Sequence, residues 1–496
     1  MKVCILKELK VYGYLELKTI LSLNKNDEEF QKKLRKLYSK GIIKYYKDKD
    51  SSKILEFQEE DIENVDLDSI GKIKDKVVYA FEYVGIIVID DHALILYPKY
   101  MNSYLEDQNN NFKSLNIILN VIQKYKNKYY QNRSIMKDEE ISKKKDLLSL
   151  IYEMIMNYKE HDLYKNDKSI IEVNGDNEIL WDKTISESTM FLSNGNPIYL
   201  DLFTVNNLID DQNYFTRLHS TILTETSNKI KPILNIFGFE EINLSNETFE
   251  DFGDKEYILY RLKKEQSIQF ITYKRRIIDL MIKYINNNFN TSNDDEPMFF
   301  GIKKFNVVWE DVCSVYKNNK RNEKIENLDL NYDFYYKNFQ KIYPFFSEEE
   351  IKNKELIKII PNPYYILDGE EKKLQETLEP DIISFENIDG FKNMVIYDAK
   401  YYNLANDIKN IPGIGDINKQ YLYQMVYKKF AKSFDLKLKK NIFLMPKESE
   451  DFEENKITIK FEIFNSLMYK DLELDLEGID VVLLPDKKVY MKYIDN

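Results

Sequence analysis

The chain has 496 residues, of which 43% are apolar and 31% are charged, and its formal net charge is −12. This size and apolar content predict about two to four folded domains and argue against a disordered chain. A protein that binds DNA by itself is usually basic, because phosphate contacts dominate the affinity. The acidic balance of this chain is not typical of that class. Any contact with DNA must therefore be local or be supplied by a partner.

The cysteines and histidines exclude other kinds of site. Cys4 and Cys313 are far apart, which argues against a disulfide framework and is typical of a reducing bacterial cytoplasm. His92, His161 and His219 share no short spacing, so a zinc site built on histidine is not expected. The sequence also lacks an apolar run long enough to span a membrane, and no membrane partner is predicted.

Residues 1–76 are predicted to form a small N-terminal unit whose elements begin in the order helix, helix, strand. Phe30, Leu34 and Leu37 have helical spacing, and Gly41 ends that helix before an apolar strand. This order resembles a helix-turn-helix or winged-helix unit, and a helical adapter is an equally good interpretation.

Residues 77–165 are predicted to combine a β-hairpin with helices. The runs GIIVI and HALILYP lie on either side of Asp90 and Asp91, which predicts two paired strands. Helical periodicity follows over 113–160 and is interrupted by the charged segment 133–146. The hairpin could dock on a partner protein.

Residues 166–295 are predicted to form a mainly helical middle domain, which begins with short strands around Trp181 and Pro197. The polar stretch 287–298 predicts a linker. In the last domain, 296–496, strands alternate with helices, which predicts a mixed β-sheet flanked by helices. The whole chain is therefore predicted to be a multidomain α/β (α+β) protein.

Two apolar runs in the last domain carry acidic residues at matched positions. Asp381 opens the run DIISF, whereas Asp398 and Lys400 end the run MVIYDAK on one face of a strand. A hairpin that turns at 387–390 would bring Asp381 beside Asp398. Two converging carboxylates repel each other unless a cation joins them, and Mg²⁺ prefers such oxygen ligands. We therefore predict a site for Mg²⁺, for which Mn²⁺ should substitute, with Lys400 orienting or deprotonating a water.

An ordinary hairpin with exposed acids and a cross-strand salt bridge is the alternative. With 84 acidic residues and 72 basic ones, mostly lysine, about eleven acidic-x-lysine triplets are expected by chance. Glu310 flanks the apolar face of a predicted helix and could reach the metal, or it is a surface glutamate. Gln420 and Gln424 share one helix face and could hold a phosphate or a water, or they belong to a surface helix.

In this order, the helical glutamate, the two acidic strands and the glutamine helix resemble the PD-(D/E)XK nuclease superfamily. The wording FNVVWEDVC, PDIIS, VIYDAKYYN and PGIGDINKQYLYQMVYKK looks like the LlaJI-type restriction endonuclease family, which is similar to McrC, the nuclease subunit of McrBC systems. The resemblance implies metal ligation by Glu310, Asp381 and Asp398. It also implies a catalytic lysine at Lys400 and a helix glutamine at Gln424, with Gln420 as the weaker match.

The resemblance further implies duplex DNA as substrate and a McrB-like AAA+ partner that hydrolyses GTP. The chain itself has no G-x-x-x-x-G-K-[ST] phosphate loop, since GIGDINK has the wrong spacing. A Mg²⁺-dependent endonuclease of a restriction system is therefore the main hypothesis. The alternatives are a repair or defence nuclease that acts on DNA ends, and a non-catalytic adaptor that stimulates the motor.

Overall fold

The computed structural model describes residues 2–21, 27–47, 77–89, 92–102, 112–131, 147–210, 212–288, 297–330, 348–367, 370–374, 377–388, 390–402, 412–449, 455–459 and 479–496. The chain divides into two compact units: unit 1 comprises residues 1–138 and 301–496, and unit 2 comprises residues 139–300. Among the helices within these described ranges, none has the length and apolarity that crossing a membrane requires.

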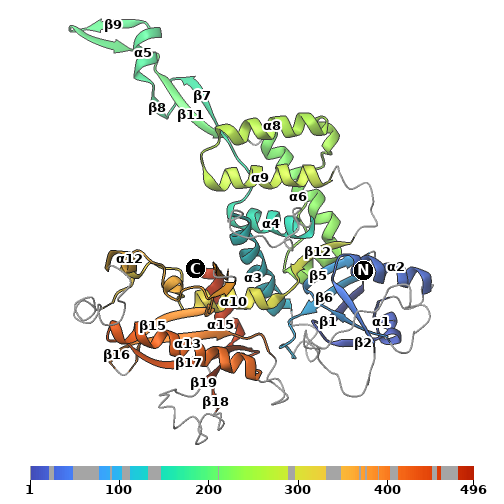
Figure 1. Ribbon diagram of the computed structural model, residues 1–496. Coiled ribbons are helices and arrows are strands. Elements are labelled where there is room, and N and C mark those ends of the chain that lie inside the picture. The colour runs from blue at the N-terminus through green and yellow to red at the C-terminus, as the bar shows by residue number, and fades with distance from the viewer. Residues whose placement is uncertain are drawn as a thin grey trace, which may run out of the picture. The chain divides into compact units, whose positions relative to one another are not determined.

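A small antiparallel sheet and two helices form the N-terminal part of unit 1 (Figure 1). Strands pair in the order β2-β4-β3. The elements are β2 (Val11–Gly13), α1 (Tyr14–Leu21), α2 (Asp27–Ser39), β3 (Ile43–Lys47) and β4 (Val77–Phe81). The predicted succession of two helices and a strand is confirmed over residues 14–47, and Gly41 ends the helical stretch with φ +63°.

A second sheet has the strand order β1-β6-β5-β12. Its strands are β1 (Lys2–Lys7), β5 (Val84–Ile89), β6 (His92–Tyr97) and β12 (Met298–Ile302). The antiparallel pair β5–β6 is the predicted hairpin, although its turn at Asp90 and Asp91 lies outside the described residues. The prediction that helices come first was wrong at residues 2–7, because β1 pairs in parallel with the distant β6.

A five-stranded mixed sheet forms the C-terminal part of unit 1, with the order β15-β16-β17-β19-β18. Its strands are β15 (Ile382–Ile388), β16 (Phe391–Ala399), β17 (Lys437–Lys447), β18 (Asn455–Ile459) and β19 (Ile479–Pro485). β16, β17 and β19 are parallel to one another, and the outer pairs β15–β16 and β18–β19 are antiparallel. The predicted mixed sheet is confirmed.

Helices cover both faces of this sheet. Alternate residues of a strand point to opposite sides, so each face of the sheet has side chains against which a helix packs. Met394 and Ile396 of β16 belong to the core beneath α13 (Ile414–Ser433). On the other face, Lys317 at the end of α10 (Phe305–Tyr316) lies over the ring of Tyr397. Trp309 of α10 is fully buried and donates from Nε1 to the carbonyl oxygen of Leu444 at 3.3 Å.

The remaining elements of unit 1 pack around these sheets. α15 (Asp486–Asp495) contacts both α10 and α3 (Phe112–Gln131). Between α10 and β15 the chain forms α12 (Glu348–Lys352) and the hairpin of β13 (Tyr364–Leu367) and β14 (Glu370–Lys373). The long helix predicted after residue 112 is thus confirmed as α3, whereas the predicted charged segment 133–146 lies outside the described residues.

Unit 2 joins a group of helices to an extended β arm (Figure 1). The helices are α4 (Leu147–His161), α6 (Tyr214–Ile230), α7 (Leu234–Phe237), α8 (Lys255–Ile268) and α9 (Thr272–Asn288). The arm consists of β7 (Asp167–Val173), β8 (Glu178–Ile179), α5 (Trp181–Glu187), β9 (Met190–Ser193), β10 (Asn196–Tyr199) and β11 (Phe203–Ile209). The short strands predicted around Trp181 and Pro197 are therefore confirmed, and the predicted multidomain α/β class describes the whole chain.

Candidate active site

The hairpin of β15 and β16 brings Asp381 beside Asp398. In the antiparallel register Ile382 lies opposite Tyr397, so the residues just outside that pair, Asp381 and Asp398, are neighbours. The carboxylate Oδ2 of Asp381 accepts a hydrogen bond from the backbone nitrogen of Ala399 at 3.0 Å. The predicted convergence of the two acidic residues is confirmed.

The two carboxyls interact strongly because both lie in poorly solvated positions. Asp398 is only 8% exposed, and burial together with the neighbouring Asp381 raises the pKa of Asp398 to about 7. Burial also raises the pKa of Asp381, and the negative charge of Glu310 adds to this effect. A hydrogen bond between the two side chains favours the protonated form of Asp398. The raised pKa values therefore disfavour ionisation of both carboxyls at once, and a bound cation could neutralise them.

Lys400 lies between two carboxylates. Its Nζ is 2.8 Å from Oδ2 of Asp398 and 3.0 Å from Oδ1 of Asp416. Burial by itself lowers the pKa of Lys400, but the attraction of Asp398 and Asp416 outweighs burial and leaves this pKa above its ordinary value. Lys400 is thus a fixed ammonium group at the edge of the acidic pair.

Glu310 lies near this group without a direct hydrogen bond to it among the described residues. Burial raises the pKa of Glu310, the positive charge of Lys400 lowers it, and the negative charge of Asp398 raises it again. Glu310 is therefore within electrostatic range of the acidic pair. Its predicted role as a metal ligand stays a prediction.

Gln420 and Gln424 both face the sheet from α13. They are 0% and 3% exposed, so the prediction of one shared helix face is confirmed, and the alternative of a surface helix is wrong for these two residues. Asn441 of β17 donates from Nδ2 to the backbone oxygen of Gln420 at 2.9 Å and to Oε1 of Gln424 at 3.3 Å. The side-chain amide of Gln420 has no hydrogen-bond partner among the described residues. The catalytic roles predicted for both glutamines stay predictions.

Asn319, just after α10, fixes the start of β15 and was missed by sequence reasoning. Its Nδ2 donates to the backbone oxygen of Asp381 at 2.9 Å, and its Oδ1 accepts from the backbone nitrogen of Ile383 at 3.1 Å. Arg321 donates to the backbone oxygen of Pro380 at 3.1 Å. These contacts hold both sides of Asp381, and no local motif around Asn319 could have indicated them.

Asp416 is the other residue that the sequence prediction missed. It lies in the first turn of α13, where acidic residues are favoured for reasons unrelated to catalysis. Its contact with Lys400 depends on how α13 packs against β16, so spacing in the sequence does not reveal it. An acidic residue at the start of the glutamine helix was the one available signal.

The donor set of the site suits a magnesium ion that keeps several of its waters. Magnesium is commonly bound by one or two carboxylates together with waters and substrate phosphates. Asp381 and Asp398 supply two such carboxylates in hydrogen-bond contact. No three histidine, cysteine, aspartate or glutamate side chains form a closed metal-binding group within the described ranges. The residues therefore fit an open two-carboxylate site better than a fully protein-ligated one.

Comparisons with known proteins give the relationship of the chain. The LlaJI restriction endonuclease family matches residues 83–332 and 315–484. The chain is 25% identical over 425 residues to the type II restriction enzyme BsuMI component YdjA of Bacillus subtilis (strain 168), a match that covers 84% of this chain and 81% of that protein.

Two solved structures of Thermococcus gammatolerans proteins are also similar to the chain. One is a half-complex of McrB AAA+ hexamers with bound McrC, with a TM-score of 0.37 and 13% identity over 100% of this chain and 99% of that one. The other is the McrBC complex, with a TM-score of 0.21 and 12% identity over 62% of this chain and 85% of that one. The family match spans most of the sequence and includes Asp381, Asp398 and Lys400. The chain belongs to the LlaJI restriction endonuclease family.

Proposed function

We propose that the chain is the cutting subunit of a restriction system and hydrolyses phosphodiester bonds of duplex DNA in a Mg²⁺-dependent reaction. The observation that carries this proposal is the convergence of Asp381, Asp398 and Lys400, with the lysine Nζ 2.8 Å from an Asp398 oxygen. A buried acidic pair is costly to keep in a structural hairpin, whereas it is suited to a site that takes up a cation.

The side chains of the site have separate roles in this proposal. Asp381 and Asp398 would hold Mg²⁺, with Glu310 as a further or water-mediated ligand. When bound, the ion supplies Lewis-acid polarisation of the scissile phosphate and a more acidic water. Lys400, as an ammonium group, stabilises negative charge on the phosphate and orients the attacking water.

Asp416 gives Lys400 a second anchor. A cation at the acidic pair competes with Lys400 for the carboxylate of Asp398, and it also repels the ammonium group. The contact of Lys400 with Asp416 at 3.0 Å would then keep the lysine directed into the site. The side chains of Gln420 and Gln424 line the neighbouring helix face, where Gln424 would position phosphate or water.

The partner is part of the proposal. The chain is acidic and has no G-x-x-x-x-G-K-[ST] phosphate loop, so nucleotide hydrolysis is assigned to a partner in this proposal. Its relative in Bacillus subtilis is described as one component of a restriction enzyme. Together with the resemblance to McrC, this supports a McrB-like AAA+ subunit that hydrolyses GTP and activates cutting.

Cleavage of closed circular duplex DNA tests the proposal. The chain, mixed with its AAA+ partner, GTP and Mg²⁺, should convert closed circles to linear molecules, and a chelator should stop the reaction. Activity on linear DNA alone would favour a nuclease that acts on ends. Stimulation of the GTPase without any cleavage would favour the non-catalytic adaptor.

A further inference from the structure

One segment of this acidic chain is strongly basic. Residues 255–276 contain seven basic side chains and two acidic ones, in a chain whose net charge is −12. Three of the seven arginines of the chain lie in it. The basic side chains are Lys255, Arg261, Lys263, Lys264, Lys274, Arg275 and Arg276. A local concentration of this kind is the footprint expected of a surface that binds phosphate.

The segment forms the helical hairpin of α8 and α9 in unit 2. Ile258 and Leu262 of α8 are buried, as are Ile277 and Ile278 of α9, so the apolar faces of the two helices are turned inward. The end of α8 and the start of α9 lie at the turn of this hairpin, and most of the basic residues are concentrated there.

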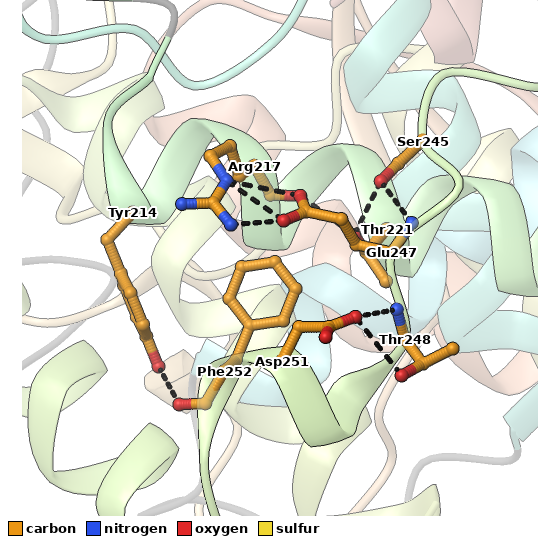
Figure 2. Close-up of polar contacts among 8 residues, drawn as sticks. All are labelled: Tyr214, Arg217, Thr221, Ser245, Glu247, Thr248, Asp251 and Phe252. Carbon is orange, nitrogen blue, oxygen red and sulfur yellow. Dashed lines mark hydrogen bonds and ion pairs between the residues drawn. The ribbon is translucent and has the colours of Figure 1, made fainter.

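The base of α8 is held by a rigid polar framework, which Figure 2 shows. Tyr214 donates to the backbone oxygen of Phe252 at 3.0 Å, and Arg217 makes a two-nitrogen ion pair with Glu247. Asp254 then caps α8 by accepting from the backbone nitrogen of Tyr257 at 2.7 Å. The hairpin is therefore presented on a fixed scaffold.

Four of the basic side chains make neither an ion pair nor a hydrogen bond with the residues that the structure describes. Arg276 is used structurally, because it pairs with Glu153 and Asp279. Arg261 stacks on aromatic rings and donates to the hydroxyl of Tyr257 at 3.1 Å. The four side chains without such contacts are those of Lys263, Lys264, Lys274 and Arg275.

The turn between the helices exposes apolar side chains beside these cations. Phe270 is 91% exposed, and Ile268 and Ile271 also project into solvent. The turn itself is anchored, since Gln269 donates to the hydroxyl of Tyr164 at 3.1 Å and accepts from the backbone nitrogen of Ile271 at 3.0 Å. The neighbours of Phe270 in the chain are therefore fixed by hydrogen bonds, and the phenyl ring itself is exposed to solvent.

We propose that this basic tip, made of Lys263, Lys264, Phe270, Lys274 and Arg275, binds the backbone of duplex DNA. The four cations would each face a phosphate, and binding would release the counterions condensed there. Phe270 would lie against the sugar edge of a groove, where apolar side chains add affinity without charge. The inference rests on the proposed function in taking duplex DNA as the substrate, and it supplies the local contact that an acidic nuclease requires.

The salt dependence of DNA binding tests the proposal. Affinity of the full chain for a short duplex would be measured by fluorescence anisotropy at several salt concentrations. The slope of log affinity against log salt is negative, and its magnitude should fall by about 2 in K263Q/K264Q and by about 2 in K274Q/R275Q, because each lost phosphate contact removes about 0.9 from that magnitude. Phe270→Ala should weaken binding without changing the slope.

A matched control is the pair Lys372→Gln and Lys373→Gln, which removes two exposed cations from β14. The control should leave the slope unchanged. The proposal is overturned if the control alters the slope and the tip variants do not. It is also overturned if the tip variants bind DNA with the same affinity and the same slope as wild type. It is also overturned if the tip variants lose only the AAA+ partner, since the tip would then be a protein-docking surface.

The proposed function and the basic tip can fail separately. Tip-dependent DNA binding by a chain that never cleaves closed circles would reject the nuclease and retain the tip. Cleavage that is unaffected in K263Q/K264Q and K274Q/R275Q at every salt concentration would retain the nuclease and reject the tip.

Discussion

The carboxylate of Asp381 accepts a hydrogen bond from the backbone nitrogen of Ala399 at 3.0 Å. This contact ties the acidic residue at the start of one strand to the strand that carries Asp398. It fixes the Asp381 carboxylate on the backbone next to Asp398, so the two carboxyls are held close together. The first predictions concern the negative charge of the carboxylates in this site.

Removing the charge of Asp398 should stabilise the folded chain at neutral pH in the absence of divalent cations. The folded state raises the pKa of Asp398 from 3.8 to about 7, so it binds that proton more tightly than the unfolded state does. The resulting stability is present below the ordinary pKa and is lost as pH rises towards 7. At pH 8 we expect Asp398→Asn to raise the free energy of unfolding by on the order of 2–4 kcal/mol.

Chemical denaturation at several pH values measures this effect. The difference between Asp398→Asn and wild type should vanish near pH 4 and should shrink at pH 8 when Mg²⁺ is added. A difference that does not change between pH 4 and pH 8 would show that Asp398 is ionised without cost, contrary to the electrostatics of the site.

Asp416 should position Lys400 without binding the metal. Asp416→Asn should lower kcat by about 10- to 100-fold while KM for DNA changes little, because the lysine loses one of its two anchors. Asp416→Glu keeps the charge and should recover part of the rate. Calcium binding, followed by calorimetry, should weaken in Asp416→Asn and recover in D416N/K400A, since Lys400 then no longer competes for Asp398. Unrecovered calcium binding in the double variant would argue for a merely structural Asp416.

Gly301 is predicted to be a packing requirement of the sheet that holds β5 and β12. A Cβ atom at this position would lie 2.2 Å from the backbone oxygen of Val84 and 2.6 Å from the ring of Tyr83. Gly301→Ala should therefore destabilise the chain by about 2 kcal/mol or more. The matched control is Gly415→Ala in α13, where a Cβ meets nothing within 4 Å and helix propensity predicts a change of at most about 1 kcal/mol in the stabilising direction.

Thermal unfolding followed by circular dichroism compares the two glycine variants. Gly301→Ala should lower Tm and Gly415→Ala should leave it unchanged or raise it. Equal values of Tm for Gly301→Ala and wild type would mean that β5 and β12 can separate at Gly301 without cost.

Much of the nuclease sheet could be predicted because its signals are local. Apolar runs, a turn with Gly390 at φ +76° and the two-residue periodicity of strands were enough to place Asp381 beside Asp398. Helical spacing likewise placed Gln420 and Gln424 on one helix face, and the structure shows that this face is buried. These features depend on residues that are close in the sequence.

The features that sequence reasoning missed all depend on contacts between distant segments. β1 pairs with β6 about 90 residues later, and a short run such as KVCILK has no periodicity that indicates such a partner. Asn319 bonds the backbone oxygen of Asp381, 62 residues away, and the backbone nitrogen of Ile383. Asp416 reaches Lys400 only through the packing of α13. Tertiary packing creates these contacts, so the local sequence pattern does not predict them.

Cleavage of closed circular DNA by a matched set of variants tests the catalytic assignment most directly. The control is Lys392→Ala, which changes another lysine of β16, one that pairs with the exposed Asp329. Wild type, Asp398→Asn, Lys400→Ala and this control would each be mixed with the AAA+ partner, GTP and Mg²⁺. We predict that Asp398→Asn and Lys400→Ala lose cleavage by at least about 100-fold and still stimulate GTP hydrolysis, while Lys392→Ala cuts like wild type. Cleavage that survives in Asp398→Asn would contradict the assignment of the site.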